Sequence, residues 1–261
     1  MGILRTDRVS GLGGANAIKR AVNFTGSRYA ETYFDIDAST DFGNLTVSRR
    51  AVAGGANATR GIGCGGNTPS GTNTIDYITM ASSSNAVDFG DATHTQSNDS
   101  AFASPTRMIV GGNGPTGNWQ FISIATTGNS QDFTEVRRMD GNDCNVRIEV
   151  PAAGSNATRG LFAGGEYQPS GGANNKLIIY TTIATLSEFS HFGDLTANKA
   201  AAGGAASKTR FVSAGGATPS YTTQIESVQI DTLGDAVDFG DLAASYVSNG
   251  GGSCNDHGGL G

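Results

Sequence analysis

The sequence has little charge, little proline and little cysteine. Only 15% of its 261 residues are charged, and the net charge is −6. With so few charges, the chain does not have the composition of a highly charged disordered protein. Its acidic balance argues against a nucleic-acid or anionic-membrane partner held by charge. Because no apolar run is long enough to span a bilayer, we expect neither nucleic-acid binding nor membrane insertion.

The few cysteines and histidines do not have the spacing of a metal or catalytic site. They are Cys64, Cys144 and Cys254, and His94, His191 and His257. Three widely separated cysteines do not make a disulfide framework. The histidines fall at different positions of the repeat described next, so they do not predict a shared zinc site or a general acid–base pair. We expect no cofactor, no metal and no catalytic residue.

Glycine is abundant, with 39 residues, and much of it belongs to an internal repeat. A Phe, often within Asp-Phe-Gly, recurs at spacings of 47, 44, 59 and 47 residues. An Arg and a following Gly-Gly pair recur with it. These markers are Phe42, Phe89, Phe133, Phe192 and Phe239, with Arg8, Arg60, Arg107, Arg159 and Arg210. They predict a single domain, 1–261, of five units at about 8–59, 60–106, 107–158, 159–209 and 210–261.

Each unit is predicted to contain four short strands. Residues 60–64 form one strand, which ends at a Gly-Gly pair able to adopt positive φ. The β-branched and aromatic run at 74–81 forms another. We place a turn and a short third strand around residues 88–91, and the fourth strand at 48–53. This pattern indicates an all-β, five-bladed β-propeller of four-stranded antiparallel blades; a β-solenoid is the alternative, although its coils are usually shorter.

The order of the strands predicts how the ring closes. The Arg8 strand lacks the strand that precedes every other Arg strand, whereas residues 245–250 occupy the repeat position of that strand. We therefore expect residues 245–250 to pair antiparallel with residues 8–13 and to complete one blade from both ends of the chain. Pairing of this kind removes two free sheet edges.

The third unit carries an insertion. Phe133 and Arg159 are 26 residues apart, whereas Phe89 and Arg107 are 18 apart. We place the eight extra residues within 140–150, a stretch with Asp143, Arg147 and Glu149. An insertion in one copy of a repeat maps to a rim, often on the binding face. These three residues are therefore our candidates for contact with a partner chain.

A charged residue at the same position of each unit must be exposed or paired. We expect Arg60, Arg107, Arg159 and Arg210 to hydrogen-bond an Asp near the repeated Phe or a backbone carbonyl; a ring of ligand-binding arginines is the alternative. The candidate acidic partners are Asp41, Asp88, Asp132, Asp194 and Asp238.

Two resemblances accompany these motifs. The unit resembles the kelch repeat, in which a strand ends in Gly-Gly and a Tyr-bearing strand, an aromatic residue and an Arg strand follow; the five Phe residues stand where kelch repeats usually carry Trp. Stretches such as IATTGN at 124–129 and DFGDL at 238–242 resemble propeller-like repeats of virion structural proteins from tailed phages, especially marine ones. This second resemblance implies a virion location. It also implies other virion proteins, further copies of the chain, or a host-surface glycan or receptor as partners.

Three enzyme-like motifs are explained by the repeat. Residues 61–66 satisfy G-x-G-x-x-G, but no predicted helix follows, as a dinucleotide site requires. The Asp-Phe-Gly copies lack the other kinase motifs and resemble a sialidase Asp-box only in part. We therefore expect a non-enzymatic structural module of a tail, fibre, neck or capsid appendage. The alternative is a carbohydrate-binding lectin with repeated sites, although the loops after the Gly-Gly pairs share no aromatic residue.

Overall fold

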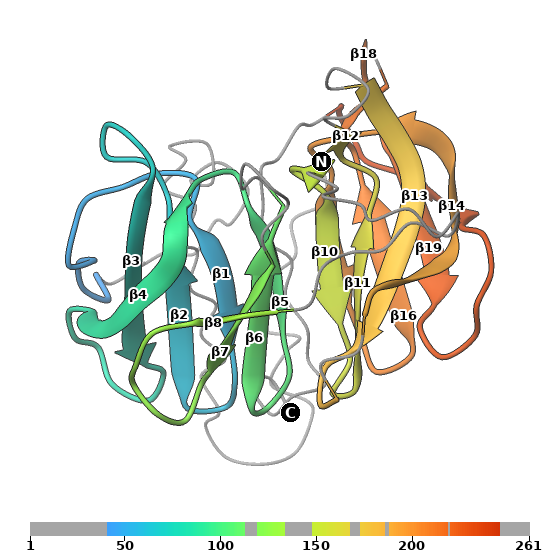
Figure 1. Ribbon diagram of the computed structural model, residues 1–261. Helices are drawn as coiled ribbons and strands as arrows, with labels where there is room; N and C mark the ends of the chain where they lie inside the picture. The colour runs from blue at the N-terminus through green and yellow to red at the C-terminus, as the bar shows by residue number, and fades with distance from the viewer. Residues whose placement is uncertain are drawn as a thin grey trace, which may run out of the picture.

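The computed structural model describes residues 41–112, 119–133, 148–167, 173–185, 188–218 and 220–245. Within these residues the chain is all β and contains no helix, so none that could cross a membrane. Four antiparallel sheets, each built on four strands, follow one another along the chain (Figure 1). They have the composition and strand order of propeller blades.

In each sheet four strands lie side by side in chain order, from an inner to an outer edge, and the third sheet has two additional strands outside this order. The first sheet contains β1 (Ala53–Ala56), β2 (Arg60–Cys64), β3 (Thr72–Thr79) and β4 (Val87–Gln96). The second contains β5 (Ser100–Ala103), β6 (Arg107–Gly111), β7 (Gln120–Ser123) and β8 (Gln131–Asp132). The third contains β10 (Ala152–Ser155), β11 (Arg159–Ala163), β13 (Ala173–Thr182) and β14 (Ser190–Lys199), extended by β12 (Glu166–Tyr167) and β9 (Ile148–Glu149). The fourth contains β15 (Gly203–Ala206), β16 (Arg210–Ala214), β19 (Gln224–Gln229) and β20 (Val237–Asp241), beside the small hairpin of β17 (Ala217–Thr218) and β18 (Ser220–Tyr221).

The predicted strand at residues 60–64 is confirmed, and the predicted strand at 74–81 is β3, which begins two residues earlier. Two other placements were wrong. The strand predicted around 88–91 is confirmed as part of β4, but the turn placed with it was wrong, because Asp-Phe-Gly at 88–90 lies inside β4 and residues 80–86 make the turn. The strand expected at 48–53 begins only at Ala53, because Ala51 has a φ of 55° and cannot continue an extended strand.

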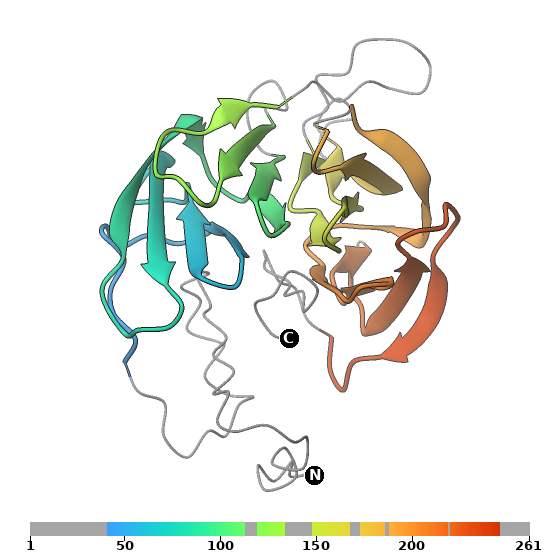
Figure 2. The ribbon, with the colours of Figure 1, turned by 90° about the horizontal axis from the view of Figure 1, so that it is seen from below.

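The sheets radiate from a common centre, seen end-on in Figure 2. The short strands β1, β5, β10 and β15 lie innermost and contact one another in that order. Each boundary between two successive sheets holds its own apolar cluster. The first includes Ile62 and Phe89, the second Trp119 and Phe162, and the third Leu161 and Phe192. The core of the described part therefore lies between blades.

Small side chains on the inner strands allow this close approach. The sequences are Ala-Gly-Gly-Ala in β1 and Gly-Gly-Ala-Ala in β15. A Cβ atom on Gly204 would lie 2.3 Å from the carbonyl oxygen of Ala153 on the neighbouring blade. A backbone oxygen cannot move away as a flexible side chain could, so any larger residue at this position forces the blades apart.

We expect Gly204→Ala to lower stability by about 1–3 kcal/mol, the usual cost of overpacking. Gly203→Ala is the matched control, because the atom nearest to its added Cβ, the Ala214 oxygen, is 3.8 Å away. The thermal midpoints of the two variants should differ by several degrees, with Gly203→Ala close to wild type. Equal midpoints would show that the inner strands are not held at this separation.

Candidate functional site

The residues that recur in the sequence meet at the boundaries between neighbouring blades. Phe89, Phe133 and Phe192 are 3%, 6% and 3% exposed, and each belongs to the apolar cluster shared with the following blade. Phe239, on the last described sheet, is 52% exposed. The repeated Phe is therefore a contact between blades, and only the copy without a following blade in the described part is open to solvent.

Three of the repeated arginines reach across the same boundaries. The Nη1 of Arg60 donates to the carbonyl of Ile124 at 2.8 Å, and that of Arg159 donates to Ile230 at 2.6 Å. Arg107 donates to the carbonyl of Ile183 at 3.2 Å. In each case the acceptor belongs to the next blade, which confirms for these three residues the prediction of a backbone acceptor.

Each guanidinium also lies over an aromatic ring. The distances to the ring centroids are 4.8 Å for Arg60 over Tyr77, 5.4 Å for Arg107 over Phe121 and 4.7 Å for Arg159 over Tyr180. The stacking holds the planar group so that its N–H points toward the neighbouring carbonyl. These arginines therefore join blades, and their aligned donors are used within the protein.

The predicted Asp partners of the arginines were wrong within the described residues. Asp88, Asp132 and Asp238 lie on exposed faces of outer strands, where a carboxylate is solvated and needs no partner. Asp194 pairs with Lys176 at 3.0 Å and with His191 at 3.5 Å. Arg8 lies outside the described residues, as does the rest of 1–40.

A second set of contacts, missed by the sequence analysis, crosses the boundaries deeper inside. The residue seven positions after each Phe meets the residue thirteen positions before the next Phe. Arg49 Nη1 lies 2.7 Å from Asp76 Oδ2. At the equivalent position of the next boundary, Gln120 Nε2 donates to Gln96 Oε1 at 2.6 Å.

The pattern continues at the other two described boundaries. After allowance for the eight-residue insertion, Ile148 and Ile179 take the two positions, and both are buried in the second apolar cluster. Lys199 and Glu226 form an ion pair at the last boundary. The side chains of both ion pairs, this one and Arg49–Asp76, are fully buried. The chemistry is therefore ionic, amide, aliphatic and ionic in turn, and at each boundary the two partners match.

A threonine that precedes each polar pair in the chain donates hydrogen bonds to the buried acceptor of that pair. Thr46 Oγ1 donates to Asp76, and Thr196 Oγ1 donates to Glu226. The backbone N–H of Thr93 donates to Gln120 Oε1 at 3.0 Å. A buried carboxylate is tolerated when all of its lone pairs have donors. The threonine four positions after the Phe supplies one of these donors.

Backbone hydrogen bonds link the blades at the start of the inner strands. The residue nine positions after the Phe has positive φ in three units, and Val150 has it at the equivalent position after the insertion. These residues are Ala51, Asn98, Val150 and Ala201. The N–H of Ala201 donates to Val150 O at 3.0 Å, and that of Val150 donates to Asn98 O at 3.4 Å. The left-handed turn costs about 1–2 kcal/mol per residue, and at Val150 and Ala201 it directs the amide toward the preceding blade.

The insertion is shorter on its C-terminal side than predicted. Glu149 lies in β9 and pairs with Glu166 of β12, and Val150 has the positive φ of its equivalents. Residues from 148 onward therefore belong to the repeated frame, and the eight extra residues lie between Phe133 and Ile148. Asp143 and Arg147 fall outside the described residues, so their contact with a partner stays a prediction.

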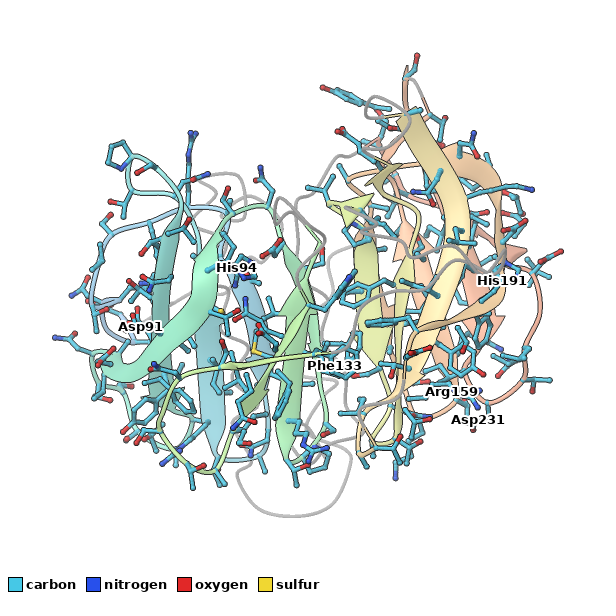
Figure 3. The ribbon with its side chains drawn as sticks, in the orientation of Figure 1. Asp91, His94, Phe133, Arg159, His191 and Asp231 are labelled. Atoms are coloured by element: carbon cyan, nitrogen blue, oxygen red, sulfur yellow. The ribbon has the colours of Figure 1, made fainter. Side chains whose placement is uncertain are left out.

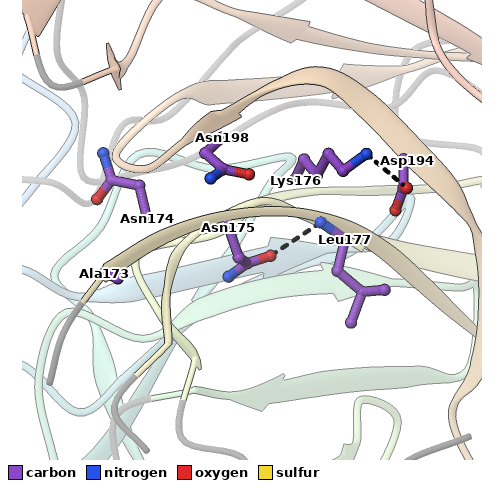
Figure 4. A pocket seen from close by; sticks show the side chains of 7 residues that line it. All are labelled: Ala173, Asn174, Asn175, Lys176, Leu177, Asp194 and Asn198. Carbon is purple, nitrogen blue, oxygen red and sulfur yellow. Dashed lines mark hydrogen bonds and ion pairs between the residues drawn. The ribbon is translucent and has the colours of Figure 1, made fainter. Parts of the chain in front are cut away.

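A hollow lies on the surface between β13 and β14 (Figure 4). Its lining includes Asn175, Lys176, Asp194 and Asn198. Asn175 Oδ1 accepts from the N–H of Leu177 at 2.9 Å, and Lys176 pairs with Asp194. Burial alone would raise the pKa of Asp194, but its bonds to Lys176 and His191 outweigh burial and lower that pKa. These groups can accept and donate hydrogen bonds, but they include no activated nucleophile.

His94 and His191 lie on different blades, on β4 and β14 (Figure 3). In the part of the chain that the structure describes, no three metal-binding side chains come together. Cys64 is a free thiol in the first apolar cluster, and burial raises its pKa well above the ordinary range. No protein-family model matches the chain, and no curated protein sequence matches it.

The Lys199–Glu226 pair can be tested by partial and complete replacement. We expect Lys199→Met to cost about 3–5 kcal/mol, because it leaves the Glu226 carboxylate buried without a cation. The double variant Lys199→Met/Glu226→Leu should recover much of this loss, since Ile148 and Ile179 fill the same positions at another boundary. Urea unfolding gives the free energy of unfolding of Lys199→Met, of Glu226→Leu and of the double variant. A double variant less stable than both single variants would contradict this account.

Stability should also depend on the protonation of His94. Burial lowers the pKa of His94, with Asp132 opposing the shift weakly, so the native state disfavours the charged ring that the unfolded state accepts below about pH 6.5. The thermal midpoint should therefore fall as the pH drops from about 7.5 to 5.5, and His94→Gln should fall less. Parallel curves for wild type and variant would exclude this contribution.

Proposed function

We propose that this chain is a closed five-bladed β-propeller that serves as a non-enzymatic structural protein of a phage virion, in a tail, fibre, neck or capsid appendage. The matched buried contacts at successive blade boundaries support the propeller part of the proposal, and the resemblance of the repeat to virion structural proteins supports the role. A module built in this way is a rigid support that presents its loops to other molecules. Its partners are other virion proteins, further copies of the chain, or a host-surface receptor or glycan.

The segments that follow the Gly-Gly pairs suit an interaction surface. Residues 67–71 form a loop closed by a bridge between Asn67 and Gly71, whereas β17 and β18 form a hairpin at the equivalent place. β12 and β18 lie at the same end of the sheets (Figure 1). A constant frame with variable segments at one end is how many scaffold folds gain binding specificity.

The sequence contains five repeat units, and the described residues form four sheets. We propose that the fifth unit completes a fifth blade. The closing strand must be moved from the predicted residues 245–250. β1 begins eleven residues after Phe42, and the same distance after Phe239 leads to residues 250–253. We therefore propose that residues 250–253 pair antiparallel with residues 9–12, in the register of β1 with β2.

Removal of residues 250–261 should lower the thermal midpoint by far more than loss of a frayed end would, because one blade would lose its inner strand. Removal of residues 258–261 alone is the control and should leave the midpoint unchanged. If both truncations behave like wild type, the ring is not closed by this strand.

The virion role is tested on particles. Phage particles purified through a density gradient from a host culture should contain the chain at a fixed copy number by quantitative mass spectrometry. Immunogold labelling should then place it on a tail, fibre, neck or capsid appendage. Recovery of the chain in the host lysate, with none in the particles, would refute the role.

A carbohydrate-binding lectin is the second candidate, favoured by the surface hollow between β13 and β14. Its Asn198 and Lys176 side chains are exposed and could meet sugar hydroxyl groups. A glycan array with the purified chain decides between the two roles. Binding that is lost in Asn198→Ala would support the lectin, and no binding to any glycan would remove it.

A further inference from the structure

The outer face of the fourth sheet lacks the cover that its equivalents have. This uncovered face consists of Val212, Ala214, Ile225 and Phe239. In the first sheet the equivalent residues are Ile62, Cys64, Ile75 and Phe89, with exposures of 0%, 1%, 0% and 3%. In the fourth sheet the first three are only partly buried and Phe239 is 52% exposed.

Two further markers on this face lack their usual neighbours. A Cβ atom on Gly43, Gly90 or Gly193 would strike the backbone of the following blade within 2.5 Å, whereas one on Gly240 meets nothing within 4 Å. Arg210 stacks over Phe239 at 5.4 Å, but it makes no hydrogen bond to a carbonyl within the described residues. Among the described residues, this face therefore has the Phe, the Gly and the Arg of a boundary but no neighbouring blade.

The equivalent faces of the first and third sheets show which residues of a following blade pack against them. Phe89 shares its cluster with Met108, Ile122 and Ile124 of the next blade. Phe192 shares its cluster with the equivalent residues Phe211, Val228 and Ile230. These partners occupy three fixed positions: one residue after the Arg, and eleven and nine residues before the next Phe.

Residues 1–40 carry the same three positions. The residue after Arg8 is Val9. Tyr33 aligns with Tyr77 only if the turn before Phe42 is three residues shorter than in the other units. This alignment places Phe34 and Ile36, eight and six residues before Phe42, at the other two positions. Arg8 and Phe42 are 34 residues apart, compared with 29 between Arg60 and Phe89, so the segment is long enough for a blade.

The position of residues 41–50 also fits a blade formed by the residues before them. Residues 41–50 lie beside the first sheet, where the N–H of Asn44 donates to Asn85 Oδ1 at 3.0 Å. Segment 1–40 is therefore joined to the described chain beside the first sheet. We infer that Val9, Phe34 and Ile36 cover the uncovered face, and that Arg210 donates to the carbonyl of Ile36. This inference rests on the five-bladed ring proposed above but not on the virion role.

The first test compares three substitutions in the full chain. Phe239→Ala should lower the thermal midpoint by about as much as Phe192→Ala does, on the order of 6 °C or more. Val237→Ala, at a position 63% exposed on the same strand, is the control and should change it little. If Phe239→Ala behaves like Val237→Ala, the face is open in solution and the inference is wrong.

The second test identifies the occupant by double-mutant cycles. Phe239→Ala and Ile36→Ala should be non-additive, as Phe192→Ala and Ile230→Ala should be. Phe239→Ala and Ile124→Ala should be additive. The milder pair Phe239→Leu and Ile36→Val gives the same readout if the alanine variants do not fold. Additivity of Phe239 with Ile36 would overturn the assignment.

Two results separate the remaining explanations. A thermal midpoint that rises with protein concentration, together with a dimer in light scattering, would assign the face to a second copy and overturn the intrachain contact. Coupling between Phe239 and Ile36 in a chain that tolerates loss of residues 250–261 would support this inference while refuting strand closure. Neither result depends on whether the chain is found in virions.

Discussion

Buried charge at the blade boundaries constrains this protein more than any other interaction described. Arg49–Asp76 and Lys199–Glu226 are fully buried, and each charge is tolerable only because its partner comes from the adjoining segment. A blade placed beside the wrong neighbour would leave a charge in an apolar cluster with no counter-ion. The ion pairs therefore contribute to the order of the blades, in the way that mismatched polar groups exclude alternative pairings elsewhere.

Much of the architecture could be predicted because it repeats at a fixed spacing. The Arg that opens one strand, the Gly-Gly pair that follows it and the Phe of the outer strand recur from copy to copy. Gly65 and Gly66 have positive φ, as the turn requires. The sequence predicted that each repeated Arg bonds either an Asp or a backbone carbonyl. Only the distance between neighbouring blades decides between these two acceptors, and a sequence does not give that distance.

The matched pairs were missed because their identity changes at each boundary while their position does not. Arg49 and Gln96 occupy the same repeat position but are different residue types, so they are not recognised as equivalent in the sequence. The sequence signal is instead that both members of a pair change together, from ionic to amide to aliphatic. The positive φ at Ala51 and Val150 has no sequence signature at all, since neither residue type favours it. At Val150 and Ala201 this conformation accompanies a backbone hydrogen bond to the preceding blade.

The changing chemistry of the pairs has a consequence for how such a gene can evolve. Tandem duplication of the unit at 60–106 would set a second Asp76 against Gln96, a carboxylate against a neutral amide, in a buried place. Deletion of the same unit would leave Arg49 opposite Gln120. Unequal recombination, which readily lengthens or shortens arrays of identical repeats, would thus yield unstable products here. Divergence of the copies has fixed their number.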